Sequence, residues 1–324
     1  AQEPGPSTVG GGHVGALMFS ALGDPLPPLI RQERTVHGAA APVAYVPARP
    51  VQEICGGLAQ GCRAGGRRPE ETRPWRLSAG TVPNAAGSAY IEQGETKLLA
   101  AVFGPRQAGE RGVRERTAEG TLAVEFNFAP FSSRFCGRED NDKRALLYGS
   151  TLRRTLESLI LLDRYAKTAF DVYLQVLEDD GAVLTAALAA ASLALADAAV
   201  EMRDLAAGAT VHLAPGPAGQ ASLLLDCDGE EERALPAGSA VVHLGLCPAR
   251  GSVCLLHSSG PLPMDKLEQM VALARSTAKA LGGEMRKCLE SRVDHHKAAK
   301  RARLSTEEQL QEPHYGVLDD GYGI

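Results

Sequence analysis

Short apolar segments bounded by turn residues predict a series of strands. In the segment 121–128 the apolar side chains of Leu122, Val124, Phe126 and Phe128 alternate with other residues, which is typical of a strand with one buried face. Further strands are expected over 85–92, 96–103, 170–177, 222–226, 240–246 and 252–257, with the turn Gln93-Gly94-Glu95 between the first two.

Three longer segments carry apolar residues at helical spacing and predict helices over 143–162, 185–205 and 264–293. The first half of 185–205 is small and apolar on almost every side. A helix of that kind is buried, and its alanines let neighbouring elements approach closely. The third helix follows Pro261 and Pro263 and is amphipathic.

The order of strands, helices, strands and a last helix predicts an α+β layered fold with a mixed sheet. The first 72 residues hold 21 glycines and prolines, a proportion typical of irregular or disordered chain. After a short basic run, the segment 305–324 holds five acids and neither lysine nor arginine. We therefore expect a Gly/Pro-rich extension over 1–67, one domain over 68–296 and a basic, then acidic, tail over 297–324.

Composition and motifs exclude several classes of function. The net charge of −5 excludes binding of nucleic acid through bulk charge, although a local basic groove remains open. The seven cysteines form no CxxC pair, which argues against a disulfide framework and a zinc knuckle and fits a reducing compartment. Nucleotide-binding glycine loops and metalloprotease or serine hydrolase motifs are absent from the sequence. We expect no cofactor and no metal site.

Charged residues gather in two kinds of cluster. Acids follow two predicted strands, as Glu178-Asp179-Asp180 and as Asp226, Asp228 and 230–232. Carboxylates at strand ends that face one cleft could hold a magnesium ion or serve as general acid or base, but a run of acids is also typical of a solvated loop. Arginines and lysines flank the strand 121–128, where they indicate a phosphate-bearing partner or, since acids are interspersed, only a soluble surface.

Several segments in fixed order resemble the RNase PH family of phosphorolytic 3′-exoribonucleases, over about 68–296. After Arg73-Pro74, they are Gly87-Ser88-Ala89-Tyr90-Ile91-Glu92-Gln93-Gly94-Glu95-Thr96-Lys97, Phe103-Gly104-Pro105-Arg106, Ala129-Pro130-Phe131-Ser132, Leu193-Ala194-Leu195-Ala196-Asp197-Ala198 and Met202-Arg203-Asp204-Leu205. The resemblance implies the RNase PH-like α+β fold (ribosomal protein S5 domain 2-like), with mixed sheets packed against helices. It also implies a reaction in which inorganic phosphate shortens RNA by one nucleoside diphosphate.

The resemblance also locates the family's catalytic positions in this chain. The first aspartate is kept as Asp180, but Val183-Leu184 stands where active members carry a Thr/Ser-Arg pair that binds phosphate. Loss of a guanidinium from an anion site forfeits about 1.5–3 kcal/mol. Two later aspartates, six residues apart, correspond to Glu232 and Gly238, and Arg144 matches a phosphate-facing arginine.

These departures predict a catalytically degenerate member, similar to the non-catalytic RNase PH-like subunits of the eukaryotic RNA exosome core. Two segments, 213–217 and 230–233, are most similar to one particular subunit of that ring. The alternative is an active phosphate-dependent 3′-to-5′ exoribonuclease, alone or as half of a composite site, because Asp180, Glu232 and Arg144 are retained. A third hypothesis is an adaptor that recruits proteins through its tails.

The exosome hypothesis implies partners and locations. We expect other RNase PH-like ring subunits, an RNA-binding cap subunit and single-stranded RNA as partners, and no membrane. The nucleus, including the nucleolus, and the cytoplasm are the expected locations. The run Lys300-Arg301-Ala302-Arg303 is either a nuclear import signal or a charge cluster at a helix end. The expected RNA contacts are Arg106, Arg111, Arg114, Arg134, Lys143 and Arg144.

Overall fold

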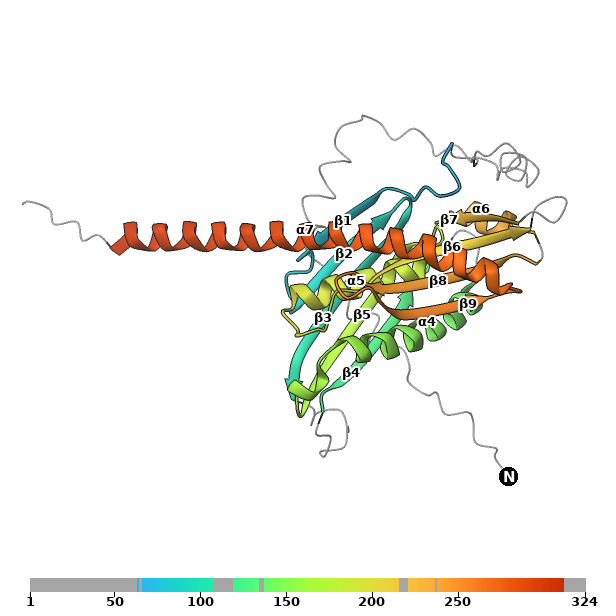
Figure 1. The fold of residues 1–324 in the computed structure, drawn as a ribbon. Helices are drawn as coiled ribbons and strands as arrows, with labels where there is room; N and C mark the ends of the chain where they lie inside the picture. Colours follow the sequence, from blue (N-terminus) through green and yellow to red (C-terminus); the bar gives the residue numbers. More distant parts are fainter. Residues whose placement is uncertain are drawn as a thin grey trace, which may run out of the picture. The chain divides into compact units, whose positions relative to one another are not determined.

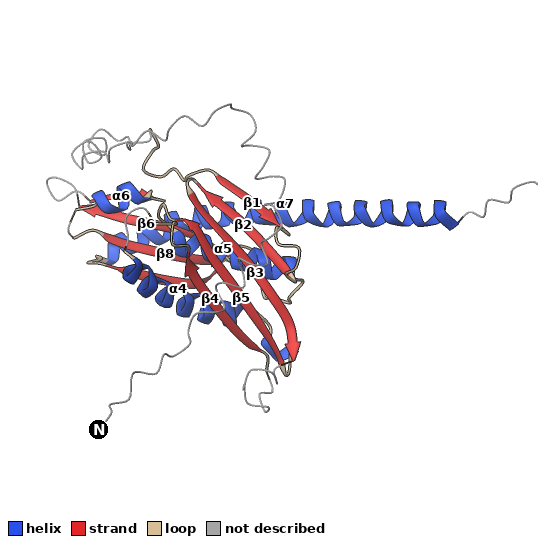
Figure 2. Ribbon diagram, turned by 180° about the vertical axis from the view of Figure 1, so that it is seen from behind, coloured by secondary structure: helices blue, strands red, loops and turns tan. Residues whose placement is uncertain are grey.

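The computed structural model describes residues 63, 66–107, 119–133, 137–215, 221–236 and 238–311. All of them belong to one structural unit, which spans 48–324. Within this unit two β-sheets pack against helices, as Figures 1 and 2 show. None of the helices in the described ranges is both long enough and apolar enough to cross a membrane.

The first sheet is mixed and five-stranded. Its strand order is β1-β2-β3-β5-β4, and only the pair β4–β5 is parallel. Because a parallel pair needs a crossover, the helix α4 (Arg138–Leu159) and the short 3-10 helix η1 (Leu162–Arg164) connect these two strands. The strands are β1 (Trp75–Ala79), β2 (Gly87–Gln93), β3 (Thr96–Gln107), β4 (Thr121–Phe128) and β5 (Thr168–Glu178).

The second sheet is antiparallel and four-stranded, with the order β7-β6-β8-β9. The short helix α6 (Gly229–Ala234) lies between β7 and β8 in the chain. The long helix α7 (Met264–Gln311) covers β6 and β8, reaches β1, and then extends past the strands (Figure 1). The strands are β6 (Ala207–Pro215), β7 (Ala221–Leu225), β8 (Ala240–Cys247) and β9 (Ser252–Ser259).

Helix α5 (Val183–Asp197) lies between the two sheets, and 13 of its 15 residues are buried. It packs on β2 and β3 from one side and on β6 from the other, behind the first sheet in Figure 2. The helix approaches β2 so closely that a Cβ at Gly87 would lie 2.4 Å from the backbone oxygen of Ala194. Small, apolar residues are therefore required in α5, because neighbouring elements pack closely on all sides of it. The predicted buried helix is confirmed.

The sequence placed most elements correctly, but it missed some elements and some ends. Strands β1 and β6 were not predicted; almost every residue of β6 is buried, so no alternation marks it. The helix predicted over 185–205 ends at Asp197, because Ala199 adopts a left-handed conformation with φ +55°. The helix predicted to end at 293 continues to Gln311, inside the predicted tail. The division into extension, domain and tail stays a prediction.

A buried arginine ties the segment before β1 to both sheets. The backbone N–H, Nε and a terminal nitrogen of Arg73 donate to the Asp226 carboxylate at 2.8, 3.1 and 2.6 Å. Its other terminal nitrogen donates to the Asp180 carboxylate at 3.1 Å and to the Asp180 carbonyl. Asp226 follows β7 and Asp180 follows β5, so one guanidinium links the ends of strands from both sheets.

A second buried pair reinforces this connection. Arg63 donates from Nε to Glu231 Oε1 at 2.8 Å and from a terminal nitrogen to Glu231 Oε2. A further terminal nitrogen donates to the backbone oxygen of Leu225 at 2.5 Å. Burial works against ionisation of Asp226 and Glu231, but the adjacent guanidinium groups outweigh it and lower the pKa of both carboxyls.

Removal of the Arg73 guanidinium should destabilise the fold severely. Arg73→Met leaves Asp226 buried and unpaired, so we expect unfolding in urea to require about 3–5 kcal/mol less free energy. Arg76→Met is the matched control, because the Arg76 side chain is 58% exposed at 3.6 Å from Glu92. The control should change stability by less than about 1 kcal/mol. Equal effects of the two substitutions would show that the Arg73 network does not support the fold.

Acid should destabilise the protein through the same carboxyls. The folded pKa values of Asp226 and Glu231 are lowered, so their contribution is complete above the unfolded values, about 3.9 and 4.3. It is lost as the pH falls from about 4 through the lower folded pKa values. We expect the free energy of unfolding to fall steeply in that window and less steeply in Asp226→Asn. An identical slope in the variant would contradict this origin.

Candidate functional site

A left-handed turn carries the chain from β5 into α5 and forms one wall of the candidate site. Gly181 and Ala182 adopt φ +85° and +54° in succession. A Cβ at Gly181 would lie 2.6 Å from the Cys227 carbonyl oxygen and 3.0 Å from Glu232 Oε1, so only glycine fits. The turn therefore packs directly against the segment that carries Glu232.

Helix α6 presents Glu232 to this turn. A capping box fixes its start: Asp228 Oδ1 accepts from the Glu231 N–H at 2.8 Å, and Glu231 Oε2 accepts from the Asp228 N–H at 3.1 Å. The Gly229 N–H donates to Asp180 Oδ1 at 3.0 Å. The two acidic clusters singled out in the sequence, one after β5 and one after β7, thus meet at one place.

Glu232 has a strongly perturbed carboxyl. Its Oε1 accepts from the Ala182 N–H at 3.2 Å and lies 3.5 Å from His212 Nε2. Burial raises the pKa of Glu232 to about 7; the Ala182 N–H opposes this rise and the charge of Asp179 adds to it. A carboxyl with such a pKa is half protonated near neutral pH, so it can either donate or accept a proton.

His212 lies on β6 behind Glu232 and is buried. Burial, followed by the charge of Arg63, lowers the pKa of His212 to about 4, so its imidazole is neutral near pH 7. Its Nδ1 is buried without a hydrogen-bond partner among the described residues. On the neighbouring strand, His243 Nδ1 lies 3.0 Å from Thr210 Oγ1, and burial lowers the pKa of His243 to about 3.

Arg144 on α4 supplies a cation beside these acids. One of its terminal nitrogens donates to Asp179 Oδ2 at 2.7 Å. Its guanidinium carbon stands 4.8 Å from the ring centre of Phe128 and 5.6 Å from that of Tyr148. Burial opposes the charge, but Asp179 outweighs it and raises the pKa of Arg144. The side chain keeps 27% of its surface exposed, so a phosphate oxygen can still reach it.

The four positions that the resemblance marked as catalytic separate into two groups. Asp180 and Glu232 both border the Gly181–Ala182 turn. Leu184 is 1% exposed and belongs to the core around α5, so it does not face the site. Gly238 is exposed with φ +93°, and a Cβ there would meet no described atom within 4 Å.

The structure describes three of the six predicted RNA contacts, and one of these three lies at this site. Arg106 pairs with Asp171 near the start of β5, about 26 Å along the strand from Asp179. Lys143 is 76% exposed and lies 3.7 Å from Asp140. Only Arg144 borders the acid cluster. Arg111, Arg114 and Arg134 lie outside the described residues, and the six contacts stay predictions.

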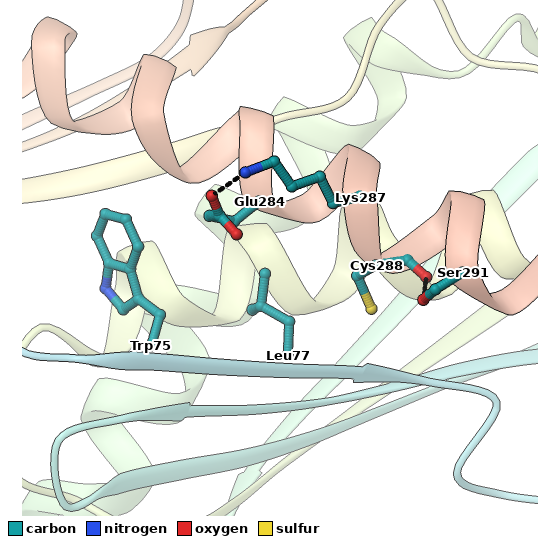
Figure 3. A pocket seen from close by; sticks show the side chains of 6 residues that line it. All are labelled: Trp75, Leu77, Glu284, Lys287, Cys288 and Ser291. Carbon is teal, nitrogen blue, oxygen red and sulfur yellow. Dashed lines mark hydrogen bonds and ion pairs between the residues drawn. The ribbon is translucent and has the colours of Figure 1, made fainter.

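A separate hollow of about 490 Å³ lies between β1 and α7 (Figure 3). The indole Nε1 of Trp75 is buried without a hydrogen-bond partner among the described residues. Lys287 Nζ donates to Glu284 Oε1 at 2.8 Å, and burial raises the pKa of Cys288, which keeps the thiol protonated. The hollow contains none of the acids at the head of α5. Its lining consists of Trp75, Leu77, Glu284, Lys287, Cys288 and Ser291.

Sequence reasoning missed two important groups. His212 stands alone in an apolar strand without a motif, and its contact with Glu232 arises only when β6 and α6 come together. Arg63 falls inside the predicted extension, yet it is paired with Glu231 in the domain. Neither residue carries a sequence signal that could have identified it.

Comparisons with known proteins identify the fold and the family. The family model described as the 3′ exoribonuclease family, domain 1 (RNase PH) matches residues 71–201. The exosome complex component Rrp41 of Thermococcus onnurineus is 35% identical over 232 residues, which are 72% of this chain and 90% of that protein. The RRP41 homolog of Arabidopsis thaliana is 34% identical over 74% of this chain and 98% of that protein.

Solved structures agree with the predicted fold. Rice Rrp46 superposes with a TM-score of 0.58 at 27% identity, covering 70% of this chain and all of that one. The Archaeoglobus fulgidus exosome with RNA bound to the active site gives a TM-score of 0.59 at 18% identity, covering 72% of this chain and 96% of that one. The latter likeness concerns the fold alone. The predicted RNase PH-like α+β fold is confirmed.

The prediction that this chain is a non-catalytic, degenerate subunit is contradicted. The matching family is one of 3′ exoribonucleases, and the relatives at 34–35% identity are Rrp41 exosome components, so the findings do not single out a degenerate subunit. The substitution at Leu184 was given too much weight, because the carboxylates and Arg144 at the head of α5 are in place. The finer similarity of 213–217 and 230–233 was to the subunit called mRNA transport regulator three, which the comparisons do not confirm.

The match covers 90–98% of the length of the Rrp41 relatives named above. Together with the family model, it shows that the chain belongs to the RNase PH family of 3′ exoribonucleases.

Proposed function

We propose that this chain is a ring subunit of an exosome core and takes part in the phosphate-dependent 3′-to-5′ degradation of RNA. The names of its relatives support the assembly, since those proteins are exosome components. The observation that carries the activity is Glu232: a carboxyl with a pKa of about 7, beside Arg144-Asp179 and at the head of α5.

The chemistry needs a proton donor and cations. An oxygen of inorganic phosphate forms a bond to the phosphorus of the last phosphodiester, and the bond from that phosphorus to the 3′-oxygen of the preceding nucleotide breaks. The departing 3′-oxygen takes up a proton, which Glu232 can supply near neutral pH. Arg144 can hold a phosphate oxygen, and Asp179 keeps its guanidinium in place.

Phosphate binding requires a contribution from outside this chain. Leu184 lies in the core and offers no guanidinium where the resemblance expects one. Because that loss forfeits about 1.5–3 kcal/mol, Arg144 alone would hold phosphate weakly. The proposed site is therefore composite: this chain supplies Glu232 and Arg144, and a neighbouring ring subunit supplies further cations.

The proposed assembly includes other RNase PH-like subunits, an RNA-binding cap subunit and single-stranded RNA. RNA would be bound through its phosphates and without sequence preference. The nucleus with its nucleolus, and the cytoplasm, are the proposed locations.

Loss of the Glu232 proton should slow phosphorolysis. In a ring reconstituted from this chain and its RNase PH-like partners, Glu232→Gln should lower the phosphate-dependent release of nucleoside diphosphates from a single-stranded oligonucleotide by about 10²-fold or more at this site. The amide keeps the size of the side chain but cannot transfer the proton. The rate is measured with and without inorganic phosphate.

The matched control is Glu230→Gln, which removes one negative charge two residues away on the same helix. It should leave the rate within about twofold, because Glu230 is only half-buried and forms no hydrogen bond or ion pair among the described residues. A correctly assembled Glu232→Gln ring that degrades RNA as fast as the unmodified ring would overturn the proposed activity.

Charge reversal at the predicted RNA contacts should weaken RNA binding by the assembled ring. For Arg111→Glu combined with Arg114→Glu, the slope of log affinity against log salt should become shallower by about 0.7 for each lost phosphate contact. Arg153→Glu is a control, since Arg153 is paired with Glu157 on the exposed face of α4. An unchanged slope in the double variant would exclude these two arginines from the RNA path.

A further inference from the structure

A buried histidine stands directly behind the proposed proton donor. Nε2 of His212 lies 3.5 Å from Glu232 Oε1, and the His212 side chain is almost fully buried. The same Oε1 already accepts the Ala182 N–H at 3.2 Å. One oxygen of the carboxyl thus faces two nitrogen atoms.

The unpartnered atom of His212 identifies the tautomer. Nδ1 is buried without a partner among the described residues. If Nδ1 carried the proton, a buried N–H donor would go unsatisfied, which native structures very seldom allow. A bare Nδ1 lone pair is less costly, so the proton belongs on Nε2, directed at Glu232.

We propose that His212 is a positioning residue that donates from Nε2 to Glu232 Oε1 when Glu232 loses its proton. This inference rests on the proposed function. The present separation of 3.5 Å is longer than a usual N–H···O hydrogen bond, and we expect it to shorten when Oε1 becomes charged. Because Oε1 already accepts the Ala182 N–H, the transferable proton resides on Oε2. His212 therefore assigns different roles to the two oxygens of one carboxyl.

Burial keeps the His212 imidazole neutral while this happens. Two guanidinium groups disfavour a positive imidazole and two ionised carboxylates favour it, but burial dominates and holds its pKa at about 4. His212 then neither takes the proton of Glu232 nor competes for it near pH 7. The charged and titratable groups that face it are Arg63 and Arg73 before β1, Asp226 after β7, Glu231 and Glu232 on α6, and His243 on β8.

The tautomer can be tested without any activity. In the full-length chain labelled with nitrogen-15 histidine, the His212 ring should show a protonated Nε2 and an unprotonated Nδ1 at pH 7. The resonance is assigned by its disappearance in His212→Gln. A proton on Nδ1 would overturn the proposal even if the ring proves to be an active phosphorolytic nuclease.

Substitution tests the effect on Glu232. In His212→Phe the ionised carboxylate loses a donor, so the pKa of Glu232, measured from its carbon-13 carboxyl resonance, should rise by about one unit. His212→Gln keeps an N–H donor and should restore the pKa to within a few tenths of a unit. The pH profile of phosphorolysis should shift by the same amount in the phenylalanine variant.

The outcomes separate the two proposals. An unchanged Glu232 pKa in a folded His212→Phe chain would overturn the role of His212. If that variant does not fold, the Glu232 pKa in His212→Gln and the His212 tautomer in the unmodified chain still test the role of His212. The proposed function alone would fail if the tautomer and the pKa shift are as expected but Glu232→Gln does not slow RNA degradation by the ring.

Discussion

The candidate site depends on the ion pairs of the Arg73 guanidinium with Asp180 and Asp226. Asp180 and Asp226 follow strands of different sheets, and as carboxylates they repel each other. Arg73 donates to both from a position that is 5% exposed, so in this dry environment its charge is screened little. The turn before α5 and the start of α6 can therefore approach each other closely enough for Glu232 to contact Ala182.

The burial of α5 limits what the site can contain. Because both sheets pack on this helix, its second residue, Leu184, belongs to the core rather than to the site surface. The departure from the family pattern at this position therefore changes how phosphate is held. It does not remove the carboxyl that could transfer a proton, since Glu232 comes from α6 and reaches the site from the other side of the turn.

The sequence predicted local features well and spatial ones poorly. Strand β4 was predicted at its observed ends, because one buried face imposes a period of two on Leu122, Val124, Phe126 and Phe128. Strand β6 was missed because burial on both faces removes that period. At the site, Asp180 and Glu232 were found through a family pattern. His212 and Arg63 were not, because their roles arise from contacts between segments distant in the chain, and no local spacing records such contacts.

Burial without a paired guanidinium explains why Glu232 keeps a proton near neutral pH. Arg63 pairs with Glu231, Arg73 with Asp226 and Asp180, and Arg144 with Asp179, so the guanidinium groups are engaged with other carboxylates. Glu232 meets a backbone N–H and a neutral imidazole instead. Burial therefore raises the pKa of Glu232 to about 7, and the charge of Asp179 adds to the rise, while the Ala182 N–H and the more distant charges of Arg144 and Arg73 only partly oppose it. The ion pairs that hold the two sheets together thereby leave Glu232 as the group best suited to exchange a proton near neutral pH.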